Sequence, residues 1–353
     1  MSEGLQALSL RALHASFGAV FGARAGWEVP DHYGDPLAEY AALRESVVAF
    51  DRSMRSRVLV AGPDAPEVIR AALAGPVGEL QEGRARRSVL LDAEGNIADL
   101  VLVARTGAAA YLVSGEPSRR AVLVERLQAA VGPDWEVRVE DRTAMTCAIG
   151  LAGPGAAEAA ARFAADTLPG RMSALQCSAF EFHGFRGMAV RTSDTGEDGF
   201  EFVLAPAVAQ HLLGMLRAGG VPLAGAAALE CARVEACIPA WEPDLEPGLS
   251  PAEADLDVLL GVPGDREGRI LAAFLLDGRP LPAGTAVVDG EGRRAGEVRS
   301  CLEAWGLKAT AGLAIMEAAA AMPGRVFRAG GAELTVVAKP LYRRRAEEQS
   351  TRW

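Results

Sequence analysis

Apolar residues recur along the chain with two different spacings, and the changes between them mark the expected helices and strands. Apolar positions at helical spacing from Leu5 to Phe21 predict an opening amphipathic helix. Further helices are expected over 40–46, 65–74, 118–131, 156–165, 207–218 and 224–237. Shorter alternating or continuous apolar stretches between them predict strands. This mixture favours α+β layers with antiparallel sheets over repeated parallel βαβ units.

The pattern changes in the last third of the chain. Residues 239–263 are acidic, rich in proline and poorly periodic, which is typical of a connector between domains. Beyond them, short strands separated by turn signals are expected over 270–275, 286–289, 297–300, 313–316 and 334–338. Short strands at this spacing indicate a small β-barrel.

Composition and charge narrow the class of protein. The 353 residues are half hydrophobic and 23% charged, so the chain has enough apolar surface for two or three domains. The net charge of −10 argues against a general nucleic-acid or acidic-membrane surface. No apolar run has the length of a membrane helix and no signal peptide is visible, so we expect a cytoplasmic protein.

Cysteine and histidine spacing gives no support to disulfides or to a metal site. The five cysteines are odd in number and lack CxxC spacing, so buried reduced thiols are expected. The four histidines are dispersed, without an HExxH motif. We therefore expect no bound metal ion.

Four short stretches carry a resemblance to a known family. TGEDGFE at 195–201 resembles the TGE-x-G-[FY]-E segment of aminomethyltransferases, the T-protein of the glycine cleavage system. AGWEVP at 25–30 resembles the family's GGWE-M-P, FDRSM at 50–54 its F-D-V-S-H-M, and ARVEA at 232–236 its R-L-E-A. Because the stretches follow the family's order along most of the chain, the sequence resembles a divergent member of this superfamily.

The resemblance implies an architecture as well as a cofactor. The family folds as a three-domain cloverleaf around a central folate pocket, and its last domain is a small β-barrel, as the strand pattern here also indicates. We expect two interleaved α+β domains over 1–238, a connector over 239–263, the barrel over 264–345 and a tail over 346–353. Tetrahydrofolate is the expected cofactor.

Asp99 is the candidate catalytic residue. It follows the turn of a hairpin expected from strands 88–92 and 97–104, and it matches the second aspartate of the family's G-x-I-D-D-L. Near the folate N5/N10 region, a carboxyl group would orient the amine and manage its proton as a one-carbon unit moves. The apolar neighbours favour a raised pKa if the side chain points inward. A strand-edge aspartate facing water is the alternative.

The resemblance also places a set of cofactor-binding residues. Glu197 follows the break at 193–196, where it would accept two parallel N–H bonds from the pterin edge; a solvated acidic turn is the alternative. Arg233 matches the R-L-E-A arginine, whose planar fork suits a folate carboxylate or carbonyl. Val113 and Asp194 fall at further pocket positions.

Several pocket positions depart from the family. Asp194 replaces the tyrosine of the family's GYTGE, Arg86 stands at a pocket tyrosine, and Ser114 follows Val113 where the family has asparagine. The family's D-F-[IV]-G-[RK]-E-A-L segment is replaced by VPGDREG at 262–268. These departures argue against the authentic T-protein reaction.

Three functions therefore remain open. The first is a tetrahydrofolate-dependent aminomethyltransferase-like or demethylase-like enzyme with a small-molecule or carrier-bound one-carbon donor. The second is a non-catalytic folate-binding regulator of the YgfZ type, linked to iron–sulfur enzymes and tRNA modification, and the third is a scaffold without folate. Retention of Asp99, Glu197 and Arg233 favours the first two. The YgfZ hallmark K-G-C-Y-x-G-Q-E is missing, since Cys237 is followed by IPAWE.

Overall fold

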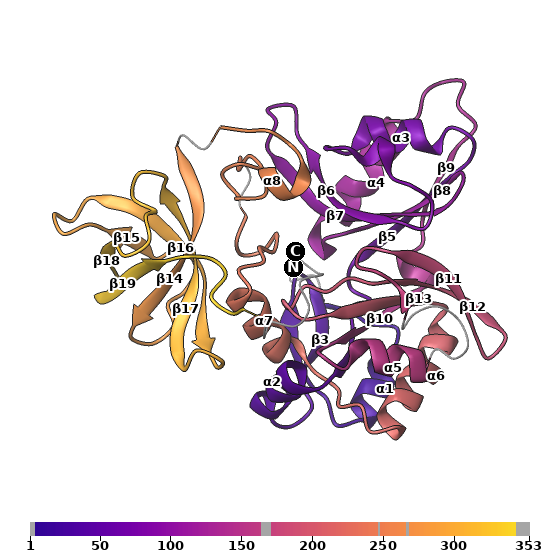
Figure 1. Ribbon diagram of the computed structural model, residues 1–353, viewed down its shortest axis with the longest axis horizontal. Coiled ribbons are helices and arrows are strands. Elements are labelled where there is room, and N and C mark those ends of the chain that lie inside the picture. Colours follow the sequence, from indigo (N-terminus) through magenta and orange to yellow (C-terminus); the bar gives the residue numbers. More distant parts are fainter. Residues whose placement is uncertain (1–3, 164–170, 246–247, 266–267, 344–353) are drawn as a thin grey trace.

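The protein is an α+β molecule with three lobes, seen in a computed structural model that describes residues 4–163, 171–245, 248–265 and 268–343. Two lobes are each built on a five-stranded antiparallel sheet, and the third is a closed barrel, orange to yellow in Figure 1. The expected fold class is confirmed, including the C-terminal barrel. The expected domain limits stay predictions, and the expected tail at 346–353 lies outside the described residues.

The first sheet, which we call sheet I, has the order β11-β12-β13-β10-β4. Its strands are β4 (Val48–Asp51), β10 (Cys147–Ala152), β11 (Cys177–Phe182), β12 (Phe185–Val190) and β13 (Gly199–Leu204). Helices α5 (Ala156–Phe163) and α6 (Pro206–Ala218) pack their apolar residues against Phe200 and Phe202 of the sheet. The alternating apolar residues of β13 are thereby buried, as the period of two predicts.

The second sheet, sheet II, has the order β6-β7-β8-β5-β9. Its strands are β5 (Ser56–Ala61), β6 (Ala85–Leu91), β7 (Ile97–Gly107), β8 (Ala110–Gly115) and β9 (Arg138–Asp141). Helices α3 (Ala65–Ala72) and α4 (Arg120–Ala129) cover it and share its core. The chain leaves sheet I after β4, builds sheet II and returns to sheet I at β10, so the loop over 52–55 links the two sheets.

The N-terminal region corrects one expectation. The helix expected from Leu5 to Phe21 is helical only in α1 (Arg11–Ser16). Gly18 adopts a φ of +87°, a left-handed conformation that ends the helix. The flanking residues form strands instead, and the region comprises β1 (Gln6–Ala7), β2 (Val20–Arg24), β3 (Trp27–His32) and α2 (Pro36–Glu45).

The barrel closes in the order β14-β17-β16-β15-β18-β19. Its strands are β14 (Arg269–Asp277), β15 (Ala286–Val288), β16 (Arg294–Ala304), β17 (Ala309–Glu317), β18 (Val326–Ala329) and β19 (Ala332–Val337). The sequence pattern did not reveal β18, because this short strand offers only Phe327 and Ala329 to the core. Closure pairs both edges of the sheet.

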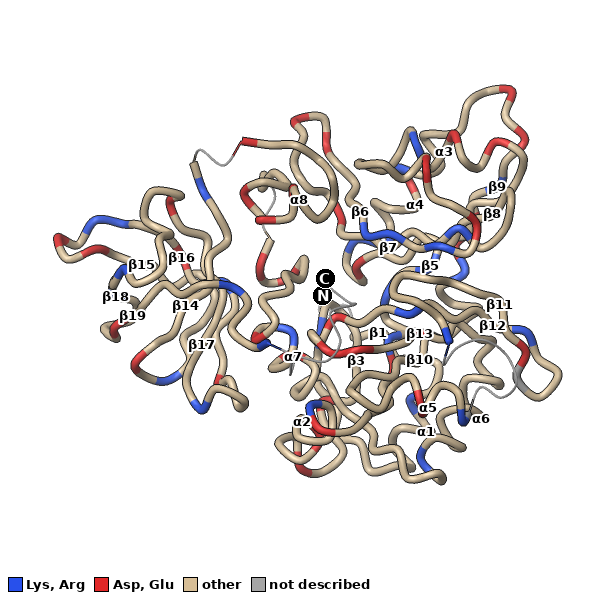
Figure 2. Tube along the Cα trace, in the orientation of Figure 1, with Lys and Arg blue, Asp and Glu red and all other residues tan. Residues whose placement is uncertain are grey.

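The segment expected as a connector is a packed part of the molecule. It follows α7 (Ala226–Glu235) and contains α8 (Asp257–Leu260). Trp241, Leu245 and Leu249 are buried together with residues of sheet II and of the barrel. Figure 2 shows acidic and basic residues interspersed over all three lobes. Among the described residues, no helix combines the length and apolar character needed to span a membrane.

A buried arginine joins the parts that meet beside α7. Arg44 of α2 donates to Glu197 (2.9 Å), to Glu235 of α7 (2.8 Å) and to the carbonyl of Thr195 (2.9 Å). Its guanidinium also lies 3.7 Å from the ring centre of Tyr342, in the segment after the barrel. Helix α2, the turn before β13, α7 and the C-terminal segment therefore share one cation.

We predict that Arg44→Gln lowers the free energy of unfolding by about 3–5 kcal/mol, because Glu197 and Glu235 would stay buried without their cation. Chemical denaturation measures the change. Arg70→Gln is the control, since the Arg70 side chain is 58% exposed beside Glu67 and its loss should cost less than about 0.5 kcal/mol. A loss of unfolding free energy below about 1 kcal/mol for Arg44→Gln would contradict the conclusion that Arg44 holds α2, the turn before β13 and α7 together.

Candidate functional site

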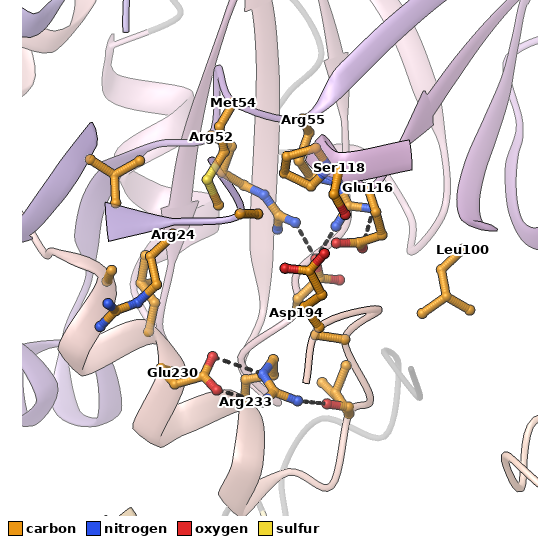
Figure 3. Close-up of a pocket in the computed structure, with 18 of the residues that line it drawn as sticks. Arg24, Arg52, Met54, Arg55, Leu100, Glu116, Ser118, Asp194, Glu230 and Arg233 are labelled. Carbon is orange, nitrogen blue, oxygen red and sulfur yellow. Dashed lines mark hydrogen bonds and ion pairs between the residues drawn. The ribbon is translucent and has the colours of Figure 1, made fainter. Parts of the chain in front are cut away.

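A cavity of about 400 Å³ lies where the two sheets meet α7 and the segment after it. Its wall combines the ends of β2 and β3, the loop after β4, parts of β6 and β7, the turn before α4, the turn before β13, and α7 (Figure 3). Pockets of 300–1,000 Å³ are typical of small-molecule sites. The cavity is the candidate functional site.

Three arginines from two elements converge on one carboxylate at this wall. Asp194, in the turn before β13, pairs with Arg52, with Arg55 (3.2 Å) and with Arg87 of β6 (2.6 Å) (Figure 3). Burial alone would raise the pKa of Asp194, but the three guanidiniums lower it well below the ordinary value. Asp194 is therefore an anion throughout the physiological pH range.

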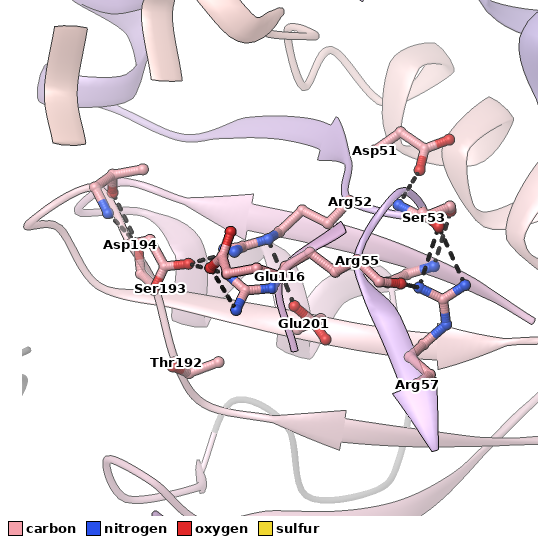
Figure 4. A network of polar contacts seen from close by, with 12 residues as sticks. Asp51, Arg52, Ser53, Arg55, Arg57, Glu116, Thr192, Ser193, Asp194 and Glu201 are labelled. Carbon is pink, nitrogen blue, oxygen red and sulfur yellow. Dashed lines mark hydrogen bonds and ion pairs between the residues drawn. The ribbon is translucent and has the colours of Figure 1, made fainter. Parts of the chain in front are cut away.

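Two further carboxylates complete this cluster. Glu116, in the turn before α4, pairs with Arg55 at 3.0 Å, and Glu201 of β13 lies 3.6 Å from Arg52 (Figure 4). We call the six residues Arg52, Arg55, Arg87, Glu116, Asp194 and Glu201 the arginine–carboxylate cluster. It holds equal numbers of positive and negative charges, and its charges satisfy one another.

Arg57 anchors the loop that carries two of these arginines. Its side chain is fully buried and donates to the carbonyls of Ser53 and Arg55 (Figure 4). It also donates to the carbonyls of Thr143 and Thr146 and to the Thr146 hydroxyl. None of these acceptors is a carboxylate, and burial lowers the pKa of the Arg57 guanidinium. Every N–H group of the Arg57 guanidinium donates a hydrogen bond, so the backbone of residues 53 to 55 is held in one conformation.

The other end of the loop is held by a buried chain of polar side chains. Burial raises the pKa of Tyr33, so its hydroxyl keeps its proton and donates to Nδ1 of His14 (2.7 Å). Nε2 of His14 then donates to Asp51 (2.9 Å), whose second oxygen accepts the N–H of Ser53 (2.7 Å). The arginine-bearing loop is thus tied to α1 as well as to β10.

Arg233 lines the opposite side of the cavity. From α7 it donates to Glu230 (Figure 3). It also donates to Asp244 and, at 3.0 Å, to the hydroxyl of Ser300 on the barrel. Burial opposes its charge, but the two carboxylates raise the pKa of Arg233 above its ordinary value. Arg233 is 7% exposed, so it is not an ordinary surface charge of a helix.

Asp99 points inward from β7 and lies directly behind the wall. It is fully buried, and Oδ1 accepts the N–H of Glu116 at 3.1 Å, while Oδ2 has no hydrogen-bond partner among the described residues. Burial, and then the charge of Glu116, raises the pKa of Asp99 well above its ordinary value. A Cβ at position 115 would collide with Oδ2, so Gly115 gives the carboxyl group its space.

The remaining sequence candidates lie away from the cavity lining. Glu197 is 2% exposed and directed to Arg44, which overturns the alternative of a solvated acidic turn. Val113 is buried in the core of sheet II. Of the five candidates, Asp194 and Arg233 line the cavity and Asp99 lies behind it.

Sequence reasoning missed the partners of Asp194. The sequence pattern includes Arg52 only as part of the FDRSM stretch and assigns no role to Arg55, Arg87 or Glu201. The available signal was the tyrosine-to-aspartate replacement at 194, because a buried carboxylate requires cations nearby. Within the described ranges, no three His, Cys, Asp or Glu side chains gather as metal ligands would.

Comparisons with known proteins agree with this architecture. The family model of the GCVT N-terminal domain matches residues 10–262. The aminomethyltransferase of Streptomyces avermitilis is 32% identical over 95% of this chain and 97% of its own length, and that of Cutibacterium acnes is 32% identical over 83% and 81%. This chain belongs to the GCVT family.

A solved member of the family has the same fold. The crystal structure of the glycine cleavage system aminomethyltransferase T from Bartonella henselae matches with a TM-score of 0.88 and 25% identity, covering 97% of this chain and 99% of that one. The protein is thus a member of the GCVT family with the fold of an aminomethyltransferase. The comparisons do not favour the YgfZ-type alternative.

Asp194→Asn should change the acid sensitivity of the GCVT-family fold. The folded pKa of Asp194 lies below the unfolded value of about 3.9, so its ion pairs stabilise the protein above that pH. This stabilisation is lost as the pH falls toward the folded pKa. We therefore expect the unfolding free energy to fall less steeply from about pH 5 to 3 in the variant than in the wild type.

Urea denaturation at a series of pH values measures both slopes. Asp277→Asn, at the exposed end of β14, is the control and should keep the wild-type slope. Equal slopes for the wild type and Asp194→Asn would contradict the ion pairs at Asp194.

Proposed function

We propose that this family member binds tetrahydrofolate in the central cavity and transfers to it a one-carbon unit from an amine donor, either a small molecule or carrier-bound. The observation that carries the proposal is Asp99, a buried carboxyl group with a raised pKa and an oxygen without a partner, directly behind the cavity wall. Perturbed carboxyl groups beside a cavity are typical of acid–base sites.

The residues present fit a folate in size and polarity. The cavity volume suits a drug-sized ligand, and Val29, Phe50, Leu100 and Leu229 give the wall apolar surface. The partnerless Oδ2 of Asp99 lies behind the residues that line the cavity, and buried polar atoms ordinarily have partners. Tetrahydrofolate, when bound, supplies amine nitrogens that accept a one-carbon unit.

Asp99 would manage the proton of this reaction. At neutral pH a raised pKa keeps a proton on the carboxyl group or allows it to take one up, and the N–H of Glu116 holds Oδ1 in place. Oδ2 is then the atom that donates or accepts the proton. Leu100 and Val101, its neighbours on β7, line the cavity and keep water from the exchange.

The other candidates have separate roles in this proposal. Arg233 and Asp194 line the cavity and would contact the cofactor. Direct contact by Glu197 or Val113 stays a prediction from the resemblance, and the bond from Arg44 supports a role for Glu197 in fixing the turn that carries Asp194. The buried free thiols support a reducing, cytoplasmic setting.

Anaerobic calorimetric titration of tetrahydrofolate into the wild-type protein tests the function. We expect micromolar binding, weakened at least tenfold, or about 1.4 kcal/mol, in Arg233→Gln. Arg70→Gln is the matched exposed control and should bind as the wild type does. Absence of heat and of thermal shift with every reduced folate tested would overturn the proposal and favour a scaffold that serves another ligand.

Asp99→Asn tests whether Asp99 exchanges a proton when tetrahydrofolate binds. We expect tetrahydrofolate binding to the wild type to be coupled to proton exchange, seen as a binding enthalpy that differs between buffers of different ionisation enthalpy. The variant, which lacks the titrating group, should lose this difference while keeping its fold. Buffer dependence that survives in Asp99→Asn would assign the proton to another residue.

The same variant has a stability signature. The folded pKa of Asp99 lies above the unfolded value, so the wild type loses stability as the pH rises from about 4 toward the folded pKa. Asp99→Asn should therefore gain stability relative to the wild type over that range. Denaturation curves at several pH values measure the difference, and a difference independent of pH would contradict the raised pKa.

A further inference from the structure

The arginines that line the central cavity differ in how firmly the protein holds them. Arg52, Arg55 and Arg87 of the arginine–carboxylate cluster pair with carboxylates, and their side chains are at most 15% exposed. An anionic group of a ligand would have to displace one of these buried pairs, and breaking a buried pair is costly. The cluster is therefore a poor site for an acidic group.

Arg233 is held just as firmly. Its guanidinium donates five hydrogen bonds, which go to Glu230, Asp244, the Ser300 hydroxyl and the carbonyl of Ile238. An arginine side chain has five N–H groups, so each of them is used within the protein. A ligand carboxylate would reach this guanidinium only by displacing one of these acceptors.

Arg24 is held much more loosely. It ends β2 at the tip of the β2–β3 hairpin and donates to the carbonyl of Ala23 and to Asp31, each at 2.9 Å. The Arg24 side chain is 45% exposed and that of Asp31 29% exposed. Exposed ion pairs contribute little to stability, so a ligand carboxylate can join or replace Asp31 at low cost.

The position of Arg24 also suits the far end of a long ligand. Figure 3 shows Arg24 and Leu100, the neighbour of Asp99 on β7, on opposite sides of the cavity. The residue after Arg24, Ala25, lines this cavity and a second one of about 600 Å³, which also share Pro117 and Ser118. A ligand that reacts beside Asp99 therefore extends toward Arg24, where the two cavities adjoin.

We infer that Arg24 binds the carboxylate end of tetrahydrofolate. The reacting amines of this cofactor are at its ring and its carboxylates are at the opposite end, so a loosely held cation across the cavity from Asp99 matches its polarity. Guanidinium groups bind carboxylates through parallel N–H bonds. The inference rests on the proposed function and deepens it, because it assigns the acidic end of the cofactor to the β2–β3 hairpin.

Arg233 has a supporting role in this arrangement, because it neutralises Glu230. Both carboxylate oxygens of Glu230 accept bonds from Arg233, at 2.9 and 2.5 Å. Burial alone would raise the pKa of Glu230, but the charge of Arg233, with a smaller effect of Arg24, lowers it. Loss of Arg233 would leave Glu230 as a competing anion near Arg24, so weaker cofactor binding in Arg233→Gln is also expected here.

Arg24→Gln tests the contact with the carboxylate. In anaerobic calorimetric titration we expect it to weaken tetrahydrofolate about tenfold or more, and to leave 6-methyltetrahydropterin, which has no carboxylate, within about twofold of the wild type. Arg11→Gln is the matched control, because Arg11 is also 45% exposed, pairs with the 29% exposed Glu28 and lies outside the cavity lining. It should leave both affinities unchanged.

The salt dependence of binding to the wild type keeps the test independent of variant folding. Raising the ionic strength from about 0.05 to 0.5 M should weaken tetrahydrofolate but not 6-methyltetrahydropterin, because salt screens exposed charge pairs. Arg24→Gln should lose most of this salt dependence.

Three results would overturn this inference alone. They are a tetrahydrofolate affinity of the wild type that does not change with salt, an affinity of Arg24→Gln within about threefold of the wild type, or an equal loss of both compounds in Arg24→Gln. A wild-type protein that binds neither compound would overturn the proposed function with it.

Discussion

The buried cation of Arg44 is the constraint on which the arrangement of the lobes depends. Two of its partners belong to the stretches that identify the family, since Glu197 lies in TGEDGFE and Glu235 in ARVEA. Both glutamates are buried and pair with Arg44. The two sequence motifs therefore meet at one structural ion pair, which fixes the turn before β13 against α7 and so sets two walls of the cavity.

A second level of constraint fixes the charged wall. Arg57 binds backbone carbonyls within the loop after β4 and in residues 143–146 before β10. The chain of side chains from Tyr33 through His14 to Asp51 holds the start of the same loop. Buried charges contribute little net stability once desolvation is counted, but breaking one partner is costly. The polar groups around the cavity therefore specify where Arg52 and Arg55 lie, and the hydrophobic cores of the sheets supply most of the folding free energy.

Period and turn signals were enough to predict much of the fold. Alternation at Phe200, Phe202 and Leu204 predicts a strand, which is β13. The sequence left the direction of Asp99 open between an inward and a water-facing side chain, and the structure shows that it is buried. The direction of Glu197 could not be predicted, because spacing does not define side-chain direction in a turn. The bond from Arg87 to Asp194 joins residues 107 positions apart, so only the tertiary fold brings them together.

The residue that departs from the family pattern at position 194 and the arginines around it depend on one another, so its change is not an isolated loss. Placing tyrosine, the residue of the family's GYTGE, at position 194 would leave Arg52, Arg55 and Arg87 with two carboxylates for three buried cations. Arg87 would then lose the carboxylate of Asp194 and keep neutral acceptors, the Thr192 hydroxyl and the Ser193 carbonyl, which offset less of its desolvation cost. Aspartate at 194 and the three arginines thus require one another. Together with Glu116 and Glu201 they form a cavity wall whose charges balance. Loss of the tyrosine alone is no evidence that the cavity has lost its ligand.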